Sequence, residues 1–155
     1  MKSKFLLALL FSAPAAAEPS VVFTLPVPQE LVVWVEAKTG TKLPEDQKIA
    51  VVENNNRIFG GGNALHSLGD AAYMGGTIYF PIRSIVHFQE TTYQALAIHE
   101  LVHETQDFNG RTYACTGQRE AEAYFYQNQY LSEHRQILIR TANEIASMNV
   151  CDGKF

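Results

Sequence analysis

Two histidines and a glutamate lie in one short segment of the chain, His99-Glu100-Leu101-Val102-His103. Residues four positions apart lie about one turn apart on the same face of an α-helix, so the two imidazoles can bind one small cation together. Glu100 follows the first histidine, where its carboxylate can reach a water on that cation. This H-E-x-x-H spacing is typical of zinc hydrolases. His99 and His103 are therefore candidate metal ligands, and Glu100 is the candidate general base.

The residues around this motif favour a helix. The stretch from Glu90 to Asp107 contains no glycine or proline, and apolar residues surround the histidines. Chance alone produces an H-E-x-x-H string in roughly one chain of this length in a few hundred. The histidines would then be ordinary polar residues of an amphipathic helix. Because unpaired imidazoles are costly inside a partly buried helix, we prefer a metal site, which needs a third ligand.

That third ligand is expected downstream, since a catalytic zinc site has three protein ligands and leaves one position for water. The candidates are Glu120 and Glu122. Helix positions two apart point in different directions, so only one of them is expected to bind the metal. The face of Glu120 is the smaller and more polar, with Ala123, Tyr124 and Gln127. Alternatively, both glutamates are ordinary acidic residues in the first turn of a helix.

The remaining elements indicate an α+β domain. We expect a helix from Pro28 or Gln29 to Gly40, with a strand as the alternative for its β-branched run. Lys48 to Val52 predicts a buried strand, and residues 71–74 and 77–80 predict a hairpin around Gly75-Gly76. Pro81 suggests that the second hairpin strand lies at a sheet edge. Beyond the motif we expect helices at about 118–134 and 136–148.

The first 17 residues are typical of a secretory signal peptide, with a basic start, a short apolar run and small residues before an expected cleavage after Ala17. The apolar run is far shorter than the ~20 residues of a membrane span. Residues 18–155 are expected to form one exported domain, periplasmic or secreted, with no membrane span. The segment from Glu18 to Pro28 could be a linker, a propeptide or part of the first packed element.

Charge and cysteine content restrict the possible partners. The chain has a net charge of −4 and no basic cluster, so nucleic acid is not an expected partner. Its two cysteines are Cys115 and Cys151. In an oxidising compartment such a pair usually forms a disulfide, which is the expected state here. As zinc ligands they would be unusual, because they lack C-x-x-C spacing.

The motif and the order of the elements resemble the gluzincin clan of zinc metallopeptidases, most closely its minimal exported bacterial members. In larger clan members the third ligand opens a pattern Glu-x-x-x-Asp or Glu-x-x-Ala-Asp. Laid on this chain, the pattern starts at Glu120, with Ala123 at the alanine and Tyr124 in place of the aspartate. The resemblance covers about residues 49–131. It supports Glu120 over Glu122 and leaves the partner of a ligating histidine unassigned.

The resemblance implies a minimal zincin-like fold, one Zn²⁺ held by His99, His103 and Glu120, and a peptide or protein substrate. Glu100 would accept a proton from the zinc-polarised water and pass it to the leaving amine. The oxyanion needs a further donor, for which the spacing leaves four candidates: Arg111, Tyr113, Tyr124 and His134. Gln106 could orient a ligand, contact substrate or be a solvated residue at the helix end. The strand at 77–80 could take an extended peptide on its edge.

Two alternatives use the same residues. One is an exported zinc-binding interaction module without turnover, with His134 or Glu122 in the position of the water. Glu100 argues against it, because a structural zinc needs no base. The other is an amidase acting on cell-wall peptides by the same zinc-water chemistry. His66 and His87 are isolated histidines and not expected ligands, and two histidines with a carboxylate also suit other divalent metals.

Overall fold

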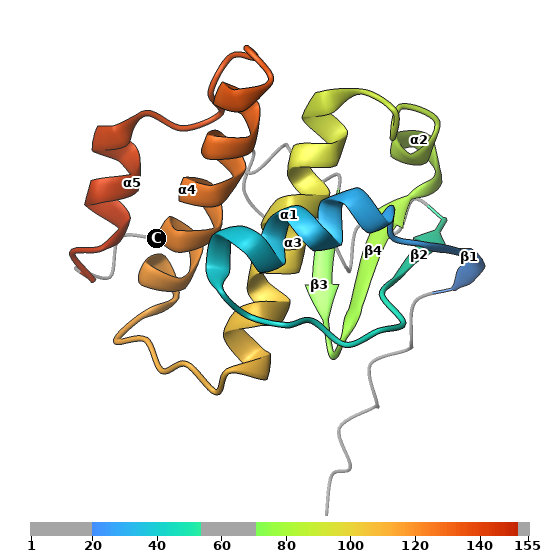
Figure 1. Cartoon of the computed structure of the whole chain (residues 1–155), viewed down its shortest axis with the longest axis horizontal. Helices are drawn as coiled ribbons and strands as arrows, with labels where there is room; N and C mark the ends of the chain where they lie inside the picture. Colours follow the sequence, from blue (N-terminus) through green and yellow to red (C-terminus); the bar gives the residue numbers. More distant parts are fainter. Residues whose placement is uncertain (1–19, 54–70, 152–155) are drawn as a thin grey trace, which may run out of the picture.

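Four strands form one mixed sheet in a computed structural model that describes residues 20–53 and 71–151 (Figure 1). The strands are β1 (Val21–Pro26), β2 (Lys48–Val52), β3 (Ala72–Met74) and β4 (Thr77–Pro81), in the order β1-β2-β4-β3. β2 and β4 are parallel, and the two outer pairs are antiparallel. The first segment after residue 20 is therefore part of the sheet and not a free linker.

The helices of the described chain are α1 (Gln29–Thr39), α2 (Ile82–Ile85), α3 (Thr91–Phe108), α4 (Thr116–Glu133) and α5 (Ala142–Met148). Figure 1 shows α3 between the sheet and α4, with α5 beyond α4. The predicted α+β class is confirmed, as are the helices expected around residues 29–39 and 91–107. The strand alternative for the first of these helices is excluded.

The hairpin is formed by β3 and β4 around Gly75 and Gly76, as predicted. Their φ angles are 54° and 83°. Positive φ at both central residues is what a type I′ hairpin turn requires, and glycine adopts it without strain. The prediction that Pro81 places the second hairpin strand at a sheet edge is wrong. β4 pairs with β2 as well, up to the pair of Val52 with Pro81, so β3 is the edge strand on this side of the described sheet. A proline at the last strand position removes only one donor from the ladder.

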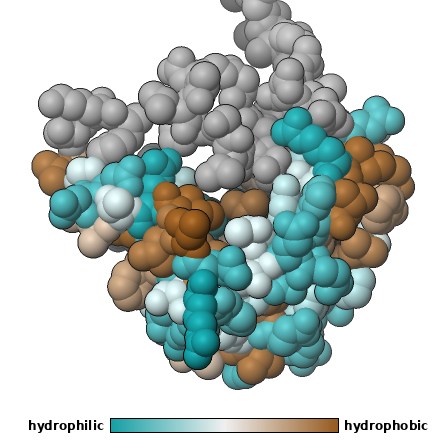
Figure 2. All heavy atoms as spheres, turned by 90° about the horizontal axis from the view of Figure 1, so that it is seen from above, coloured by the Kyte–Doolittle hydropathy of each residue, from teal (hydrophilic) through white to brown (hydrophobic). Residues whose placement is uncertain are grey.

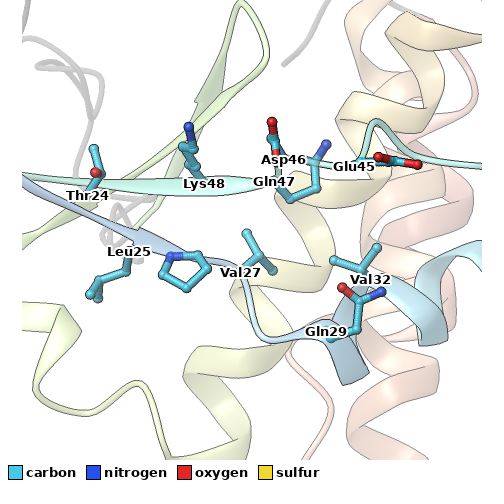
Figure 3. A pocket seen from close by; sticks show the side chains of 10 residues that line it. Thr24, Leu25, Val27, Gln29, Val32, Glu45, Asp46, Gln47 and Lys48 are labelled. Atoms are coloured by element: carbon cyan, nitrogen blue, oxygen red, sulfur yellow. The ribbon is translucent and has the colours of Figure 1, made fainter.

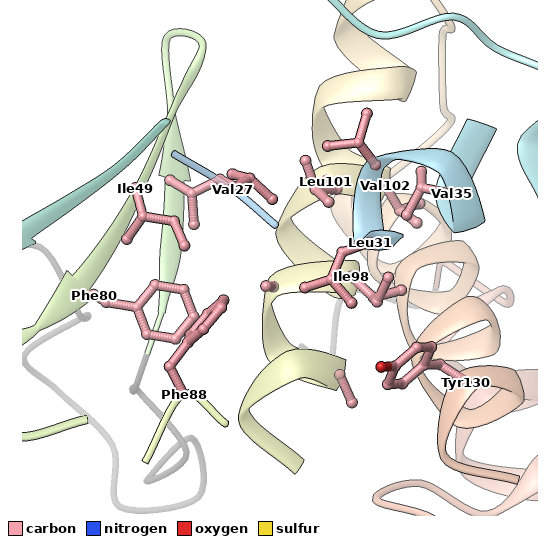
Figure 4. Close-up of a cluster of buried hydrophobic side chains, with 14 of the residues drawn as sticks. Val27, Leu31, Val35, Ile49, Phe80, Phe88, Ile98, Leu101, Val102 and Tyr130 are labelled. Carbon is pink, nitrogen blue, oxygen red and sulfur yellow. The ribbon is translucent and has the colours of Figure 1, made fainter. Parts of the chain in front are cut away.

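A single apolar core joins the sheet to three helices (Figure 4). Ile49 and Phe80 come from the sheet, and the Phe80 ring meets Phe88 edge to face at 5.5 Å between centroids. Burying a side chain of this size stabilises a fold by about 1.5–3 kcal/mol. The helices contribute the following fully buried residues: Leu31 and Val35 from α1, Ile98, Leu101 and Val102 from α3, and Leu131 from α4. This core fixes α3 between the sheet and α4, which positions the motif.

β1 is exposed along its whole length although its sequence is apolar. Val21, Val22, Phe23 and Leu25 are all exposed. In the space-filling view, brown spheres gather on the right-hand side, where β1 and α2 lie in Figure 1 (Figure 2).

The last helix begins later than predicted. The sequence suggests helix from about residue 136, but α5 starts at Ala142. Arg135 has a left-handed φ of 56°, which ends the preceding helix, and Thr141 caps α5 through a capping box with Glu144. The predicted disulfide is confirmed: Cys115 and Cys151 are bonded, which ties the start of α4 to the segment after α5.

The predicted signal peptide (1–17) and His66 lie outside the described residues. Within the described part of the chain, no helix has the length and apolar character needed to span a bilayer.

Candidate metal centre

The two motif histidines lie side by side on α3. Both are buried, at 7% exposure for His99 and 6% for His103. Their rings meet edge to face, with centroids 4.8 Å apart and the two Nε2 atoms 3.1 Å apart. The apolar neighbours Leu101 and Val102 point into the core, so the helix places the imidazoles toward α4.

Glu120 reaches these imidazoles from α4. One carboxylate oxygen lies 3.2 Å from Nε2 of His99, and the other lies 3.3 Å from Nε2 of His103. Glu122, the other candidate, points elsewhere: its carboxylate accepts hydrogen bonds from Arg111, Tyr113 and Gln106. The face of α4 that the sequence analysis favours is therefore the one that meets the histidines.

The spacing of the three side chains suits a small cation. Four ligand atoms placed 2.0–2.1 Å from a tetrahedral zinc are about 3.3–3.4 Å from one another. The Nε2 atoms of His99 and His103 are 3.1 Å apart, one oxygen of Glu120 is 3.2 Å from the first, and its other oxygen is 3.3 Å from the second. Within the described residues, no further histidine, cysteine, aspartate or glutamate joins this group. Three side chains of the described chain could thus hold the ion, which is the number of protein ligands in a catalytic zinc site.

Two buried carboxamides set the orientation of the imidazoles. Nδ1 of His99 lies 3.1 Å from Oε1 of Gln127, and Nδ1 of His103 lies 2.8 Å from Oε1 of Gln106. The amide nitrogen of Gln106 donates to the carbonyl of Arg119 and to Glu122, which fixes the amide oxygen toward His103. A carboxamide oxygen only accepts hydrogen bonds, so these two contacts favour a proton on each Nδ1. Arg119 Nε also lies 3.3 Å from Nδ1 of His103, a contact that favours the other tautomer there.

With the protons on Nδ1, the Nε2 atoms of both histidines present lone pairs toward each other and toward the carboxylate of Glu120. Such a cluster of acceptor atoms is repulsive unless a proton or a metal ion lies among them. The buried partners thus prepare the imidazoles to bind through Nε2.

The pKa shifts reflect the same contacts. Burial alone would raise the pKa of Glu120, but hydrogen bonds and positive charge from His103 and His99 hold it far below its usual value. Burial would lower the pKa of His103, and the hydrogen bond and charge of Glu120 raise it instead. Glu120 and His103 thus each favour the charged form of the other.

Glu100, the candidate base, is buried at 8% exposure on the side of α3 that faces β3. Its carboxylate accepts the backbone N–H of Tyr73, the central residue of β3. Burial, aided by the charge of Glu120, raises the pKa of Glu100 despite the opposing effect of the two histidines. A carboxylate with a raised pKa takes up a proton more readily, as a general base must.

The other residues singled out from the sequence have different surroundings. Only Tyr124 among the oxyanion candidates touches the triad, with its ring centroid 4.6 Å from that of His99. His134 is turned to the carbonyl of Tyr130. His87 pairs with Glu90 and lies apart from the triad. Neither His134 nor Glu122 joins the triad, so the described residues provide no fourth protein ligand.

Gln106 contacts His103 and is buried, which excludes the alternative of a solvated residue at the helix end. The sequence analysis did not predict that Gln127 contacts His99. Its position seven residues after Glu120, on the same helix face, could have indicated this contact. Arg119 was also missed; its Nε donates to Oε1 of Gln106 at 3.2 Å and so supports the same network.

A separate groove lies at the other end of the sheet, between β1, the start of α1 and the segment before β2 (Figure 3). Figure 3 shows Glu45, Gln47 and Lys48 along one side and Val27, Gln29 and Val32 along the other. None of the triad residues lines it, and it contains no histidine or cysteine.

Comparison of the chain with protein-family models, curated proteins and solved structures finds no match. The interpretation of the site therefore rests on its own geometry. A buried pair of histidines on α3 and a glutamate on α4 fit the metal site of an H-E-x-x-H…E zincin.

Proposed function

We propose that this protein is a zinc-dependent hydrolase that cleaves peptide bonds, with His99, His103 and Glu120 as metal ligands and Glu100 as general base. The observation that carries this proposal is the convergence of three side chains: the two imidazole Nε2 atoms are 3.1 Å apart, and each is 3.2–3.3 Å from a different oxygen of the Glu120 carboxylate. The motif glutamate supports catalysis over a purely structural role, since a structural zinc needs no neighbouring base.

Zinc supplies Lewis-acid chemistry in such a site, polarising a water and the substrate carbonyl. The side chain of Glu100 accepts the proton of the attacking water and later gives it to the leaving amine. Gln127 and Gln106 keep the two imidazoles in the tautomer that binds metal. Tyr124, beside His99, is the residue best placed to donate a hydrogen bond to the developing oxyanion.

The substrate strand is expected at the edge of β3. The sequence suggested the strand at 77–80 for this role, but β4 has strands on both sides. Tyr73 N–H points away from β4, because it donates to Glu100, so the base lies directly at this edge. An extended peptide added to β3 would therefore pass the general base, as strand addition in peptide recognition allows.

Export is part of the same proposal. The Cys115–Cys151 disulfide supports an oxidising compartment, and residues 1–17 would provide the signal for reaching it. The mature protein would then be the single domain of residues 18–155.

Metal content is the first test. Elemental mass spectrometry of the purified mature protein should find about one zinc per chain, and Glu120→Ala should lose it. Glu122→Gln is the matched control, two positions along α4, and should keep the metal. A metal-free protein even after zinc loading would contradict the proposal.

Turnover is tested separately with Glu100→Gln. This variant should retain zinc and lose cleavage of a denatured protein or peptide library. Zinc binding without any Glu100-dependent cleavage would instead indicate an exported zinc-binding module.

A further inference from the structure

Arg140 lies near the metal centre, separated from it by one aromatic ring. Its guanidinium carbon is 5.0 Å from the ring centroid of Tyr124, and that ring is 4.6 Å from the ring of His99. The guanidinium is therefore within about 10 Å of a proposed ligand. Two residues of extended peptide span roughly 7 Å, so a substrate group one or two residues from the cleaved bond can reach it.

One nitrogen of this guanidinium has no partner, and another is only loosely paired. Nε is buried and has no hydrogen-bond partner. Nη1 forms an ion pair with Oε1 of Glu144 at 3.6 Å, which is longer than an ordinary hydrogen bond. Its other oxygen is occupied by the N–H and hydroxyl of Thr141. Within the described residues, the charged group is thus held near the site without a bidentate acceptor.

The backbone of Arg140 is fixed by α4. The carbonyl oxygen of the Asn128 side chain accepts the N–H groups of Ile139 and Arg140, at 3.1 and 3.4 Å, and its amide donates to the carbonyl of Arg140. Asn128 lies one turn beyond Tyr124 and two turns beyond Glu120 on α4. One helix therefore positions the guanidinium, the intervening ring and the third ligand together.

We propose that Arg140 binds a carboxylate of the substrate, so that this hydrolase selects peptides with a carboxylate one or two residues from the cleaved bond. The planar guanidinium matches a carboxylate through two parallel hydrogen bonds, and a substrate carboxylate would give it a closer partner than Glu144, whose oxygen is 3.6 Å away. The carboxylate is either the C-terminus of the peptide or an acidic side chain. This inference rests on the proposed function, because it specifies the substrate class of the same site.

The first experiment measures binding. Succinate and its monoamide, succinamate, are titrated into the zinc-loaded protein by calorimetry. The wild-type protein should bind succinate at least ten-fold more tightly than succinamate. One carboxylate of succinate would bind the metal, and the other would bind Arg140. Arg140→Gln should lose this preference, and Arg140→Lys should keep part of it. Arg135→Gln, which removes a charge from the same inter-helix segment, is the matched control and should keep the preference in full.

Arg140 also stacks on Tyr124, so its replacement can disturb the fold. Arg140→Met, which keeps an unbranched stem on the ring but no charge, is therefore measured alongside, with zinc content and circular dichroism recorded for each variant. Equal binding of succinate and succinamate by folded wild type, or an unchanged preference in Arg140→Met, would overturn the proposal.

The second experiment distinguishes the two carboxylate sources. Each test peptide is made with a free C-terminus, with a C-terminal amide, and with the amide plus a glutamate near its end. A higher kcat/KM for the free acid alone assigns the C-terminal carboxylate, and recovery by the glutamate assigns a side chain. Cleavage with no carboxylate preference would refute the role of Arg140 and leave the hydrolase standing. A succinate preference without cleavage of any peptide would support the role of Arg140 and contradict the proposed hydrolase activity.

Discussion

Nδ1 of His99 lies 3.1 Å from Oε1 of Gln127, a fully buried carboxamide on the neighbouring helix. In many metal sites a carboxylate takes this place. Here Gln106 does the same for His103, whose Nδ1 also lies 3.3 Å from Nε of Arg119. The nitrogen of Gln127 is buried and has no hydrogen-bond partner, so the contact with His99 is the hydrogen bond that this side chain makes among the described residues.

Replacing Gln127 with leucine should weaken zinc binding by about 10–100-fold, the usual effect of losing an outer partner of a ligand. The fold should tolerate the change well, because leucine removes a buried donor that had no acceptor. Competition with a chromophoric chelator measures the affinity. Gln129→Leu, on another face of α4, is the control, and equal affinity in both variants would refute the orienting role.

Zinc binding should weaken as the pH falls, beginning above the ordinary histidine pKa of 6.5. The pKa of His103 is raised, because Glu120 outweighs the effect of burial, and the metal needs the neutral imidazole. Calorimetric titrations between pH 6 and 8.5 would show the onset. In Glu122→Gln, which leaves the partner of His103 in place, the onset should stay at the same pH; an onset below pH 6 in wild type would contradict the prediction.

Stability of the metal-free protein should be greatest at mildly acidic pH. Glu120 has a lowered pKa, so its contribution is present above its unfolded value of 4.5 and is lost as the pH falls toward its folded pKa. His103 has a raised pKa, so its contribution is present below 6.5 and is lost as the pH rises through its folded pKa. Urea unfolding with a chelator, compared between wild type and Glu120→Gln, should show this extra stability in wild type alone.

Glu122→Ala should destabilise the fold by about 1–3 kcal/mol, because it leaves buried or half-buried donors of Gln106 and Tyr113 without their acceptor. Burial and the hydrogen bond to Glu122 also raise the pKa of Tyr113 to about 12. The variant should restore a lower pKa to this phenol, which an ultraviolet titration detects. An unchanged titration would show that the contact is not formed in solution.

Replacing Cys115 and Cys151 with serine should lower the free energy of unfolding by about 3–4 kcal/mol for a closed segment of this size. The sequence separation is 36 residues. Chemical denaturation of the double variant measures the loss. Zinc affinity should fall as well, since Glu120 lies five residues after Cys115 at the tethered start of α4.

Local patterns in the sequence predicted most of the fold. The motif helix was predicted correctly from the absence of Gly and Pro between residues 90 and 107, and the hairpin was predicted correctly from the Gly75-Gly76 pair. The position of β4 could not be read in the same way, because its parallel pairing with β2 joins segments far apart in the chain. The late start of α5 had a local signal, the capping box from Thr141 to Glu144, which competes with the helical pattern before it.

In the candidate site, too, local sequence patterns predicted some residues and long-range packing determines the others. His99, Glu100 and His103 follow from spacing within one helix, and the helix face favoured Glu120. Gln127 shares the helix face of Glu120, so its position could be inferred from spacing as well. The contacts of Arg119 and Arg140 depend on how α3, α4 and the segment after α4 pack together. Spacing along one helix holds no information on that packing.

The disulfide encloses one half of the proposed site. Glu120, Gln127 and Arg140 all lie between Cys115 and Cys151, whereas His99, Glu100 and His103 precede the closed segment. Formation of the disulfide thus restrains α4, which carries Glu120, and places no such restraint on α3, which carries the two histidines. We expect a newly made chain with reduced thiols to have the two histidines ready and the third ligand loosely held. For a protein that is exported and active as we propose, thiol oxidation would come first and firm metal uptake second, which would delay activity until the chain has left the compartment of its synthesis.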